Sequence, residues 1–564
     1  MENIYNLNIS KKSSAIKLDT IINKRNHYIN FNNNKAKSNS INYSNGIFIV
    51  DKNFISINEY YNDLELIHKY TEDDSLRSFS HDRFKLLLLN WEIYKSNNKQ
   101  KEFEERMTLE KDFYNIPKVD THIHHSSSMN QKFLLNFVKN KIINSPDEVV
   151  LEKNGKKLTL INILKDINIT PDKLNVDIMN VHAVGERHCF MRFDKFNSKY
   201  NPCGLSDLRN VFLKTDNYIN GRYLAEMTRS MIEDLEKNKY QYVEWRLSIY
   251  GKDINEWNKL ADWVCNNNLL SKKVKYFIQI PRLYNIYKEN KFVDNFSDMI
   301  YNIFYPVLNN TINPASNLNL SKFLENIGGF DSVDDETKYD VDINKNEIPT
   351  PNEWNMNVNP PYSYYLYYMY VNICSLNKLR SLNNINLMEF RPHCGEGGSK
   401  NHILSGFLLS TKGISHGVKI FKNPTYKYLF YLTQIGISMS LLSNNALVVK
   451  YGENPFPIMF KAGLNVSLST DDPLMFHYTR EPLMEEYSMA AQFYNLSNTD
   501  MCELAKNSVE QSCMYEKIKK DHYDNINDDL KNNNLTNIPK NRIEFRKSLL
   551  ENEKNFLTKL IKLK

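Results

Sequence analysis

From Lys118 onward the chain repeats one pattern, in which a short apolar segment ends in polar side chains and a longer helical stretch follows. Strands that alternate with helices form a parallel sheet. Seven segments are predicted as strands, at 118–124, 242–251, 274–282, 387–396, 413–417, 436–445 and 464–472. One further strand, placed near 181–190, brings the count to eight, which predicts an α/β fold of the (β/α)8 TIM-barrel type. A doubly wound sheet is the alternative, but it gives no reason for polar residues to end so many strands.

The segments on either side of this pattern set the expected domain organisation. Residues 1–45 are rich in Asn, Lys and Ser, which favours a disordered or loosely held arm. Residues 46–115 contain charged stretches with helical periodicity, which predicts an N-terminal helical extension. The barrel, with long inserts, is expected over 116–515. A charged helical segment over 516–564 is expected to pack on the barrel.

Charge and cysteine content exclude several classes of protein. The 72 Lys and Arg residues are scattered and nearly balanced by 66 Asp and Glu residues, so nucleic-acid binding is not expected. The seven cysteines form no C-x-x-C motif and predict reduced thiols in a cytoplasmic protein.

The N-terminus lacks the apolar core of a signal peptide. The longest uncharged stretch, Tyr428–Val449, holds too many polar groups for a membrane span and predicts a buried helix followed by a strand.

Histidines and a carboxylate at the predicted strand ends indicate a metal site. Side chains alternate along a strand, so His122 and His124 face the same way while His125 faces away. His393 ends another predicted strand, and Asp471 ends a third. Each histidine alone would be read as a hydrogen-bonded core residue. Three imidazoles and one carboxylate that converge, with a position left for water, suit catalytic zinc.

Three more polar residues fall beside these candidate ligands. Two adjacent carboxylates repel each other, so the pair Asp471 and Asp472 indicates a cation, with Asp472 left to face a substrate. Glu396 is placed to donate a proton to a substrate nitrogen, and His416 to orient or deprotonate the attacking water. The alternatives without a catalytic role are a solvent-exposed loop carboxylate for Glu396 and a buried imidazole with its hydrogen bonds satisfied for His416.

Taken together, the motifs of this chain resemble those of the AMP deaminase family. The matching stretches run in order from about residue 80 to about residue 545. They are KVDTHIHHSSSMNQK, RFDKFNSKYNPCG, KTDNYINGRY, EWRLSIYG, QIPRLY, GFDSVDDE, NPPYSYYLYY, RPHCGEGG, ISHG, SLLSNN, SLSTDDPL and EPLMEEYSMA.

The resemblance implies hydrolytic deamination of AMP to IMP and ammonia, by attack of zinc-bound hydroxide on C6 of the purine. It implies that Glu396 protonates the ring nitrogen and that His416 is the proton acceptor. The implied ligands of one zinc ion per subunit are His122, His124, His393 and Asp471. The implied substrate-binding residues are His124, Lys195, Phe196, Asn197, Ser198, Lys199, Tyr200, Glu396, Asp472, Pro473, Leu474 and Met475.

The family pattern also implies a homotetramer under nucleotide control, although the N-terminal region matches the family poorly. Met475 stands where the family typically has Gln, which removes that side-chain contact. His125 and Ser126 stand where the family has small residues, and little effect is expected because His125 faces away.

Adenosine deaminases share the metal motifs, so the choice of a nucleotide substrate depends on other residues. Arg192, Lys195 and Lys199 fall within eight positions among aromatic residues, which favours a buried phosphate site. An adenosine-type deaminase and a catalytically silent barrel that senses nucleotides are the alternatives. The H-x-E and P-C-x-x-C signature of cytidine-type deaminases is missing from the sequence.

Overall fold

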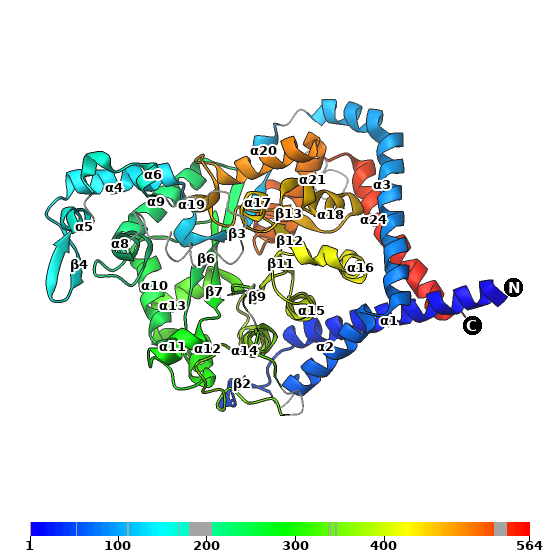
Figure 1. Cartoon of the computed structure of the whole chain (residues 1–564), viewed down its shortest axis with the longest axis horizontal. Coiled ribbons are helices and arrows are strands. Elements are labelled where there is room, and N and C mark those ends of the chain that lie inside the picture. The colour runs from blue at the N-terminus through cyan, green and yellow to red at the C-terminus, as the bar shows by residue number, and fades with distance from the viewer. Residues whose placement is uncertain are drawn as a thin grey trace.

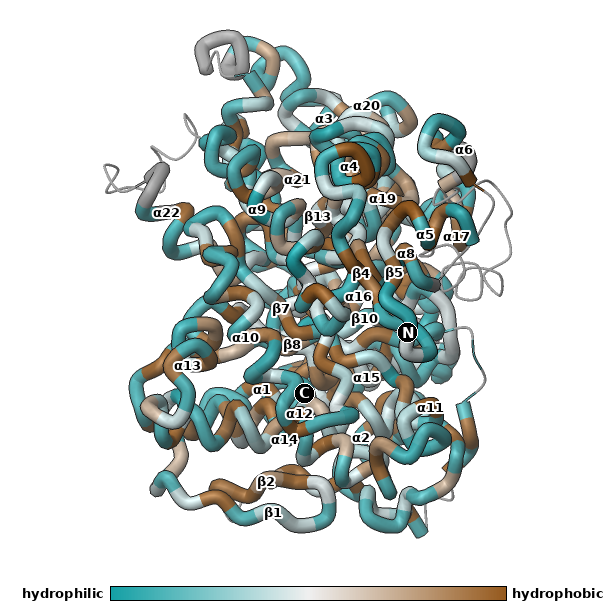
Figure 2. The backbone as a smooth tube through the Cα atoms, turned by 90° about the vertical axis from the view of Figure 1, so that its left-hand side faces the viewer, coloured by the Kyte–Doolittle hydropathy of each residue, from teal (hydrophilic) through white to brown (hydrophobic). Residues whose placement is uncertain are grey.

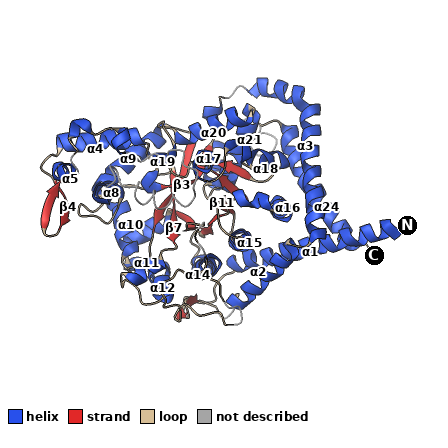
Figure 3. Cartoon of the chain, viewed as in Figure 1, coloured by secondary structure: helices blue, strands red, loops and turns tan. Residues whose placement is uncertain are grey.

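Eight parallel strand positions form the centre of the molecule, surrounded by helices (Figures 1 and 3). The computed structural model describes residues 2–51, 54–109, 112–166, 169–179, 206–336, 338, 340–343, 347–523 and 538–563. The strands are β3 (Lys118–His124), β6 (Gln241–Ser248), β7 (Val274–Pro281), β8 (Ile327–Val333), β9 (Glu389–Phe390) with β10 (His393–Cys394), β11 (Gly413–His416), β12 (Gly436–Met439) and β13 (Val466–Leu468).

Parallel pairing follows the order of the chain around the barrel. One sheet runs β3-β6-β7-β8-β9 and the other β10-β11-β12-β13. β9 and β10 are the two halves of one strand position, joined through Arg391. The barrel closes where Asp471 bridges Ile123 of β3: Asp471 donates its N–H to the carbonyl of His122 and accepts from the N–H of His124, both at 2.9 Å. The predicted (β/α)8 fold is therefore confirmed.

One predicted strand is placed differently. The strand that was missing from the seven predicted segments is β8, which is the fourth strand position along the chain. The segment near 181–190, where that strand was expected, lies outside the described residues. The sequence of β8, IGGFDSV, looks like a turn because of its glycines. Gly329 is required there by close approach, since a Cβ on it would lie 2.2 Å from the carbonyl oxygen of Glu389.

Helices cover the outside of the barrel. Those that follow strands are α10 (Glu256–Asn266), α11 (Tyr284–Glu289), α12 (Phe296–Ile312), α13 (Leu318–Glu325), α14 (Tyr362–Leu382), α15 (Lys400–Leu409), α16 (Pro424–Thr433), α17 (Leu441–Leu447), α18 (Phe456–Ala462), α19 (Pro473–Phe476), α20 (Pro482–Tyr494), α21 (Asn498–Gln511) and α22 (Tyr515–Tyr523). The insert between β3 and β6 holds α4 (Gln131–Asn144), β4 (Val149–Lys153), β5 (Lys156–Thr159), α5 (Leu160–Asp166), α6 (Val176–Met179), α8 (Ser206–Leu213) and α9 (Arg222–Lys237). Figure 2 shows polar and apolar stretches alternating along these helices, as expected for elements with one face on the core.

The N-terminal residues are not the loosely held arm that their composition suggests. They form α1 (Glu2–Asn32), which buries Leu18, Ile21 and Tyr28 against the rest of the molecule. The apolar residues recur at helical spacing, but the surrounding Asn, Lys and Ser residues lower the mean hydropathy and hide the pattern. A short hairpin of β1 (Asn42–Ser44) and β2 (Ile47–Ile49) follows.

Helix α14 is buried along nearly its whole length because it lies between the barrel and the N-terminal helices. Its tyrosines each need a hydrogen-bond acceptor. Tyr365 donates to the carbonyl of Ile280 in the barrel, and Tyr370 donates to the carbonyl of Tyr28 in α1. The tyrosine-rich motif therefore joins the N-terminal extension to the barrel.

The C-terminal helix α24 (Lys540–Lys562) packs beside α1 and α3 (Asp74–Leu109), as the right-hand side of Figure 1 shows. The remaining helix of the extension is α2 (Ile57–Thr71). Arg542 is fully buried and donates to Glu102 of α3 at 2.8 Å and to Asp500 of α21 at 2.6 Å. The C-terminal segment thus holds the N-terminal helices to the barrel. None of the described helices is long and apolar enough to cross a membrane.

We expect Arg542→Ala to lower the free energy of unfolding by about 3–5 kcal/mol, because the carboxylates of Glu102 and Asp500 would lose their buried cation and keep only Lys95, which is partly exposed. Chemical denaturation followed by circular dichroism measures the change. Lys540→Ala is the control on the same helix: its ion pair with Glu544 is exposed, and its loss is expected to cost under about 1 kcal/mol. Equal effects of the two substitutions would contradict the anchoring role of Arg542.

Candidate active site

The four predicted metal ligands lie together at the carboxyl ends of three strands. His122 and His124 are on β3, His393 is on β10 and Asp471 directly follows β13. One ligand atom from each lies within 4.8 Å of all the others. His122 Nε2 is 2.9 Å from His393 Nε2, and Asp471 Oδ1 is 3.2 Å from His124 Nε2 and 3.5 Å from His122 Nε2. His125 faces away, as expected, and bonds Thr228 of α9 through Nε2 at 2.9 Å.

Buried partners orient the imidazoles toward the centre of the cluster. His393 Nδ1 is 2.9 Å from Asp331 Oδ1 on β8, and His124 Nδ1 is 2.6 Å from Gln279 Oε1 on β7. Both partners are acceptors, so both imidazoles carry a proton on Nδ1 and turn Nε2 inward. Burial tends to lower the pKa of His124, but the charges of Asp472 and Asp471 raise it to about 9, so a cation bound at Nε2 would replace a proton there. Inward-facing imidazole nitrogens beside a carboxylate suit a divalent cation, and the donor set fits one.

Electrostatics set the protonation states of His122 and of Asp331, the partner of His393. Burial, and then the charge of Arg246, hold the pKa of His122 well below its usual range, so this imidazole is neutral. Burial alone would raise the pKa of Asp331, but His393 and the ion-paired Arg246 hold it at about 2. Asp331 therefore remains charged and holds His393 in place.

Two candidate residues have strained backbones. Asp471 has φ +61° and His416 has φ +71°, whereas most other non-glycine residues with positive φ are asparagines. Strain of this kind costs about 1–3 kcal/mol and persists where the surrounding structure enforces it. Here it turns both side chains toward the same point, since His416 Nε2 lies 4.0 Å from Asp471 Oδ2.

Helix α17 fixes both of these strained residues. Ser443 donates to Asp471 Oδ2 at 2.6 Å, and Asn444 Nδ2 lies 3.3 Å from His416 Nδ1. α17 follows β12 directly, so the SLLSNN stretch supports the cluster from the neighbouring strand position.

We expect Ser443→Ala to weaken metal affinity about 10–100-fold, the usual effect of removing a partner of a metal ligand. Competition with a chromogenic chelator measures it. Ser440→Ala is the matched control, because Ser440 is equally buried but bonds Ser469, at 3.0 Å, and no ligand. If both variants bound metal as tightly as the parent, Asp471 would not depend on Ser443.

The predicted proton-transfer residues flank the cluster. His416 Nε2 is 3.9 Å from Glu396 Oε2, and both side chains are buried. Asp472 accepts a hydrogen bond from Ser127 beside β3. Pro473, Leu474 and Met475 are buried in α19, the short helix that follows Asp472. The predicted substrate segment from Lys195 to Tyr200 lies outside the described residues.

Glu336, in the loop after β8, fixes the backbone that carries Glu396. Its carboxylate accepts from the N–H of Gly395 at 2.8 Å and from the N–H of Glu396 at 3.3 Å. Burial tends to raise the pKa of Glu336, but the hydrogen bond to His402 keeps it below its usual value, so the carboxylate is ionised. A charged acceptor of two N–H groups limits the movement of Glu396.

Sequence reasoning missed the residues that support the ligands. They are Arg246, Gln279, Asp331, Glu336, Ser443 and Asn444. Five of them lie in the stretches QIPRLY, GFDSVDDE and SLLSNN, where polar side chains at the carboxyl ends of strands could have served as a signal.

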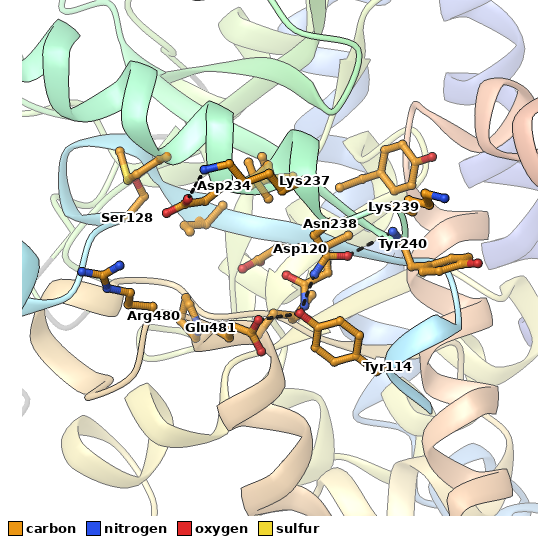
Figure 4. Close-up of a pocket in the computed structure, with 18 of the residues that line it drawn as sticks. Tyr114, Asp120, Ser128, Asp234, Lys237, Asn238, Lys239, Tyr240, Arg480 and Glu481 are labelled. Atoms are coloured by element: carbon orange, nitrogen blue, oxygen red, sulfur yellow. Dashed lines mark hydrogen bonds and ion pairs between the residues drawn. The ribbon is translucent and has the colours of Figure 1, made fainter. Parts of the chain in front are cut away.

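A cavity of about 580 Å³ lies away from this cluster, between the N-terminal half of β6 and the start of α20 (Figure 4). Its polar groups largely satisfy one another. Tyr114 donates to Glu481 at 2.6 Å and accepts from Asn238 at 3.1 Å, while Lys237 lies 3.5 Å from Asp234. We therefore retain the His and Asp cluster, and not this cavity, as the candidate active site.

Fold and site together define the class of the protein: a (β/α)8 barrel with a candidate metal centre at the carboxyl ends of its strands. The model of the AMP deaminase family matches residues 10–563. This chain belongs to the AMP deaminase family.

Individual relatives agree with the family match. The chain is 48% identical over 504 residues to an AMP deaminase of Saccharomyces cerevisiae, covering 88% of this chain and 62% of the relative. It is 45% identical over 506 residues to an AMP deaminase of Dictyostelium discoideum, covering 89% and 63%. It thus spans less than two thirds of the length of each. Among solved structures, the Arabidopsis N6-mAMP deaminase MAPDA matches 72% of this chain and 97% of its own at 15% identity, with a TM-score of 0.44.

Proposed function

We propose that this chain hydrolyses the C6 amino group of AMP, so that AMP and water give IMP and ammonia. The observation that carries the proposal is the convergence of His122, His124, His393 and Asp471 with Glu396 and His416 in a member of the AMP deaminase family. Adenosine-type deamination is the alternative for the same residues, and the substrate comparison below separates the two.

Three imidazoles and one carboxylate are the donor set that we propose for one Zn²⁺ per subunit. The ion, when bound, would lower the pKa of a coordinated water molecule to about 7 and so supply hydroxide at neutral pH. The inward-facing Nε2 atoms of His124 and His393 support this assignment.

Each of the other side chains has a proton to move or a group to hold. Glu396 donates a proton to the purine ring nitrogen, which leaves C6 more electrophilic. His416, 3.9 Å away, accepts the proton of the attacking water. Asp472, oriented by Ser127, accepts a hydrogen bond from the purine or the water and aligns attack. The C–N bond then breaks: the proton held by His416 passes to the departing amino group, which leaves as ammonia, and the proton of the C6 hydroxyl returns to Glu396 as the C6 carbonyl forms.

Further parts of the proposal come from the family pattern. Residues Lys195–Tyr200 and Pro473–Met475 contact the substrate, and the protein acts in the cytoplasm as a homo-oligomer, a tetramer in its family, under nucleotide control. Met475 offers no amide at the position where the family pattern has Gln, so binding on that side of the substrate depends on the apolar surface of α19.

Ammonia release from AMP and from adenosine by the purified, zinc-loaded protein tests the proposal. We expect turnover of AMP and little of adenosine. Release of ammonia from adenosine alone would favour the adenosine-type deaminase. Release from neither, with zinc retained, would favour a silent, nucleotide-binding barrel.

A further inference from the structure

Glu486 is a buried acid that has no part in the reaction steps described above. It lies on α20 within the stretch EPLMEEYSMA, and its side chain is fully buried. Burying a carboxyl group is costly unless the surroundings supply hydrogen bonds to it. The groups around Glu486 therefore indicate what this side chain does.

The carboxyl group of Glu486 closes the start of α17. Its Oε2 accepts from the N–H of Leu441 at 3.1 Å, and its Oε1 accepts from the N–H of Leu442 at 3.4 Å. These belong to the first-turn N–H groups that a helix leaves without an internal partner. Ser440, directly before the helix, bonds Ser469 through its hydroxyl at 3.0 Å. Glu486 therefore takes the place of the usual capping side chain.

His477 lies on the other side of the same carboxyl group. It directly follows α19, is fully buried, and has its Nε2 3.2 Å from Glu486 Oε1. Burial raises the pKa of Glu486 well above its usual value and lowers the pKa of His477 to about 4, so both are neutral at pH 7. A neutral acid can donate to His477 Nε2 while its other oxygen accepts from Leu441. Glu486 thus joins the end of α19 to the start of α17, which packs against both α19 and α20 (Figure 1).

Helix α17 is short and carries two of the side chains that support the metal ligands and the proton acceptor. It has seven residues, so Ser443 and Asn444 lie within about one turn of the N–H groups that Glu486 binds. Ser443 donates to Asp471 Oδ2 at 2.6 Å, and Asn444 Nδ2 lies 3.3 Å from His416 Nδ1. A shift of the first turn of α17 would therefore move both supporting side chains.

We propose that Glu486 is a positioning residue, which holds the first turn of α17 in the place from which Ser443 reaches Asp471. Through the same turn it keeps Asn444 beside His416, and it ties that turn to the end of α19, part of the proposed substrate surface. Glu486 touches no reacting atom. The inference rests on the proposed function, because that function places zinc on Asp471.

Competition with a chromogenic chelator for Zn²⁺ tests the proposal without turnover. Glu486→Leu, made in the full-length protein, removes both oxygens and should weaken Zn²⁺ binding about 10–100-fold, the usual effect of disturbing the partner of a metal ligand. Glu486→Gln keeps an acceptor for Leu441 and has an amide donor for His477, so it should bind Zn²⁺ within about threefold of the parent. A loss as large in Glu486→Gln as in Glu486→Leu would overturn the proposal, because it would not follow the acceptor.

A double-mutant cycle separates positioning from a general contribution to folding. In a Ser443→Ala background the path from α17 to Asp471 is already broken, so Glu486→Leu should weaken Zn²⁺ binding by less than about twofold. A general effect on stability would instead weaken Zn²⁺ binding equally whether or not Ser443 is present. Equal losses in the two backgrounds would therefore overturn the positioning role.

Glu485→Leu is the matched control on the same helix. The Glu485 carboxylate accepts from the N–H groups of Tyr478 and Thr479, in the loop after α19 and not in α17, so Zn²⁺ affinity should not change. If Glu486→Leu fails to fold, Glu486→Asp gives the same comparison, because its carboxyl group is one methylene shorter and falls short of α17. Parental Zn²⁺ affinity in folded Glu486→Asp would then overturn the proposal.

The outcomes also separate this inference from the proposed function. A folded Glu486→Leu protein that binds Zn²⁺ like the parent would overturn the positioning role even if the parent deaminates AMP. A parent that releases no ammonia from AMP, while its Zn²⁺ binding is weakened by Glu486→Leu and kept by Glu486→Gln, would overturn the proposed function and leave the positioning role supported.

Discussion

Asp471→Asn is expected to abolish the retention of zinc and to lower kcat for AMP by on the order of 10³ or more. Metal-ion catalysis supplies several kcal/mol of stabilisation, and each 1.36 kcal/mol is a factor of ten in rate. Asparagine tolerates the positive φ of this position and can still accept from Ser443, so the change removes the charge and leaves the backbone that closes the barrel.

Metal content by mass spectrometry and ammonia release from AMP measure the two effects together. Asp262→Asn, an exposed acid on α10, is the control for loss of one negative charge. Chelation of the unsubstituted protein should give the same loss, and added Zn²⁺ should reverse it only where Asp471 is intact. A metal-free variant with full turnover would contradict the role of the cluster.

Glu396→Gln is expected to lower kcat by about 10²–10⁴, the usual contribution of general acid catalysis. Glutamine has the same shape and cannot donate the proton, while Glu336 still accepts from the backbone N–H groups of residues 395 and 396. Metal content should stay unchanged, which separates this effect from loss of the ion.

Glu453→Gln, in the short helical turn after α17, is the control because that carboxylate lies outside the site. Single-turnover kinetics locate the defect in the chemical step. Near-normal turnover by the pure, metal-loaded Glu396→Gln protein would remove this residue from the mechanism.

The sequence was sufficient to predict the barrel and the set of His and Asp residues that the fold brings together. Strand and helix periodicity depends on neighbouring residues, so seven of the eight strand positions could be read directly. The spacing of His122 and His124 places both on one face of β3 for the same local reason. Where composition obscured local pattern, as in α1 and β8, the prediction was wrong.

The sequence by itself determined which side chains stand at the ends of the strands, because alternation along a strand is a local property. Only the tertiary structure decided what supports them and what lies beside them. His124 meets Gln279 across 155 positions and His122 meets His393 across 271, through strand register and closure of the barrel at Asp471. Contacts set by register between distant strands leave no local periodicity, which is why the hydrogen bonds from the N–H groups of Gly395 and Glu396 to Glu336 emerged only from the fold.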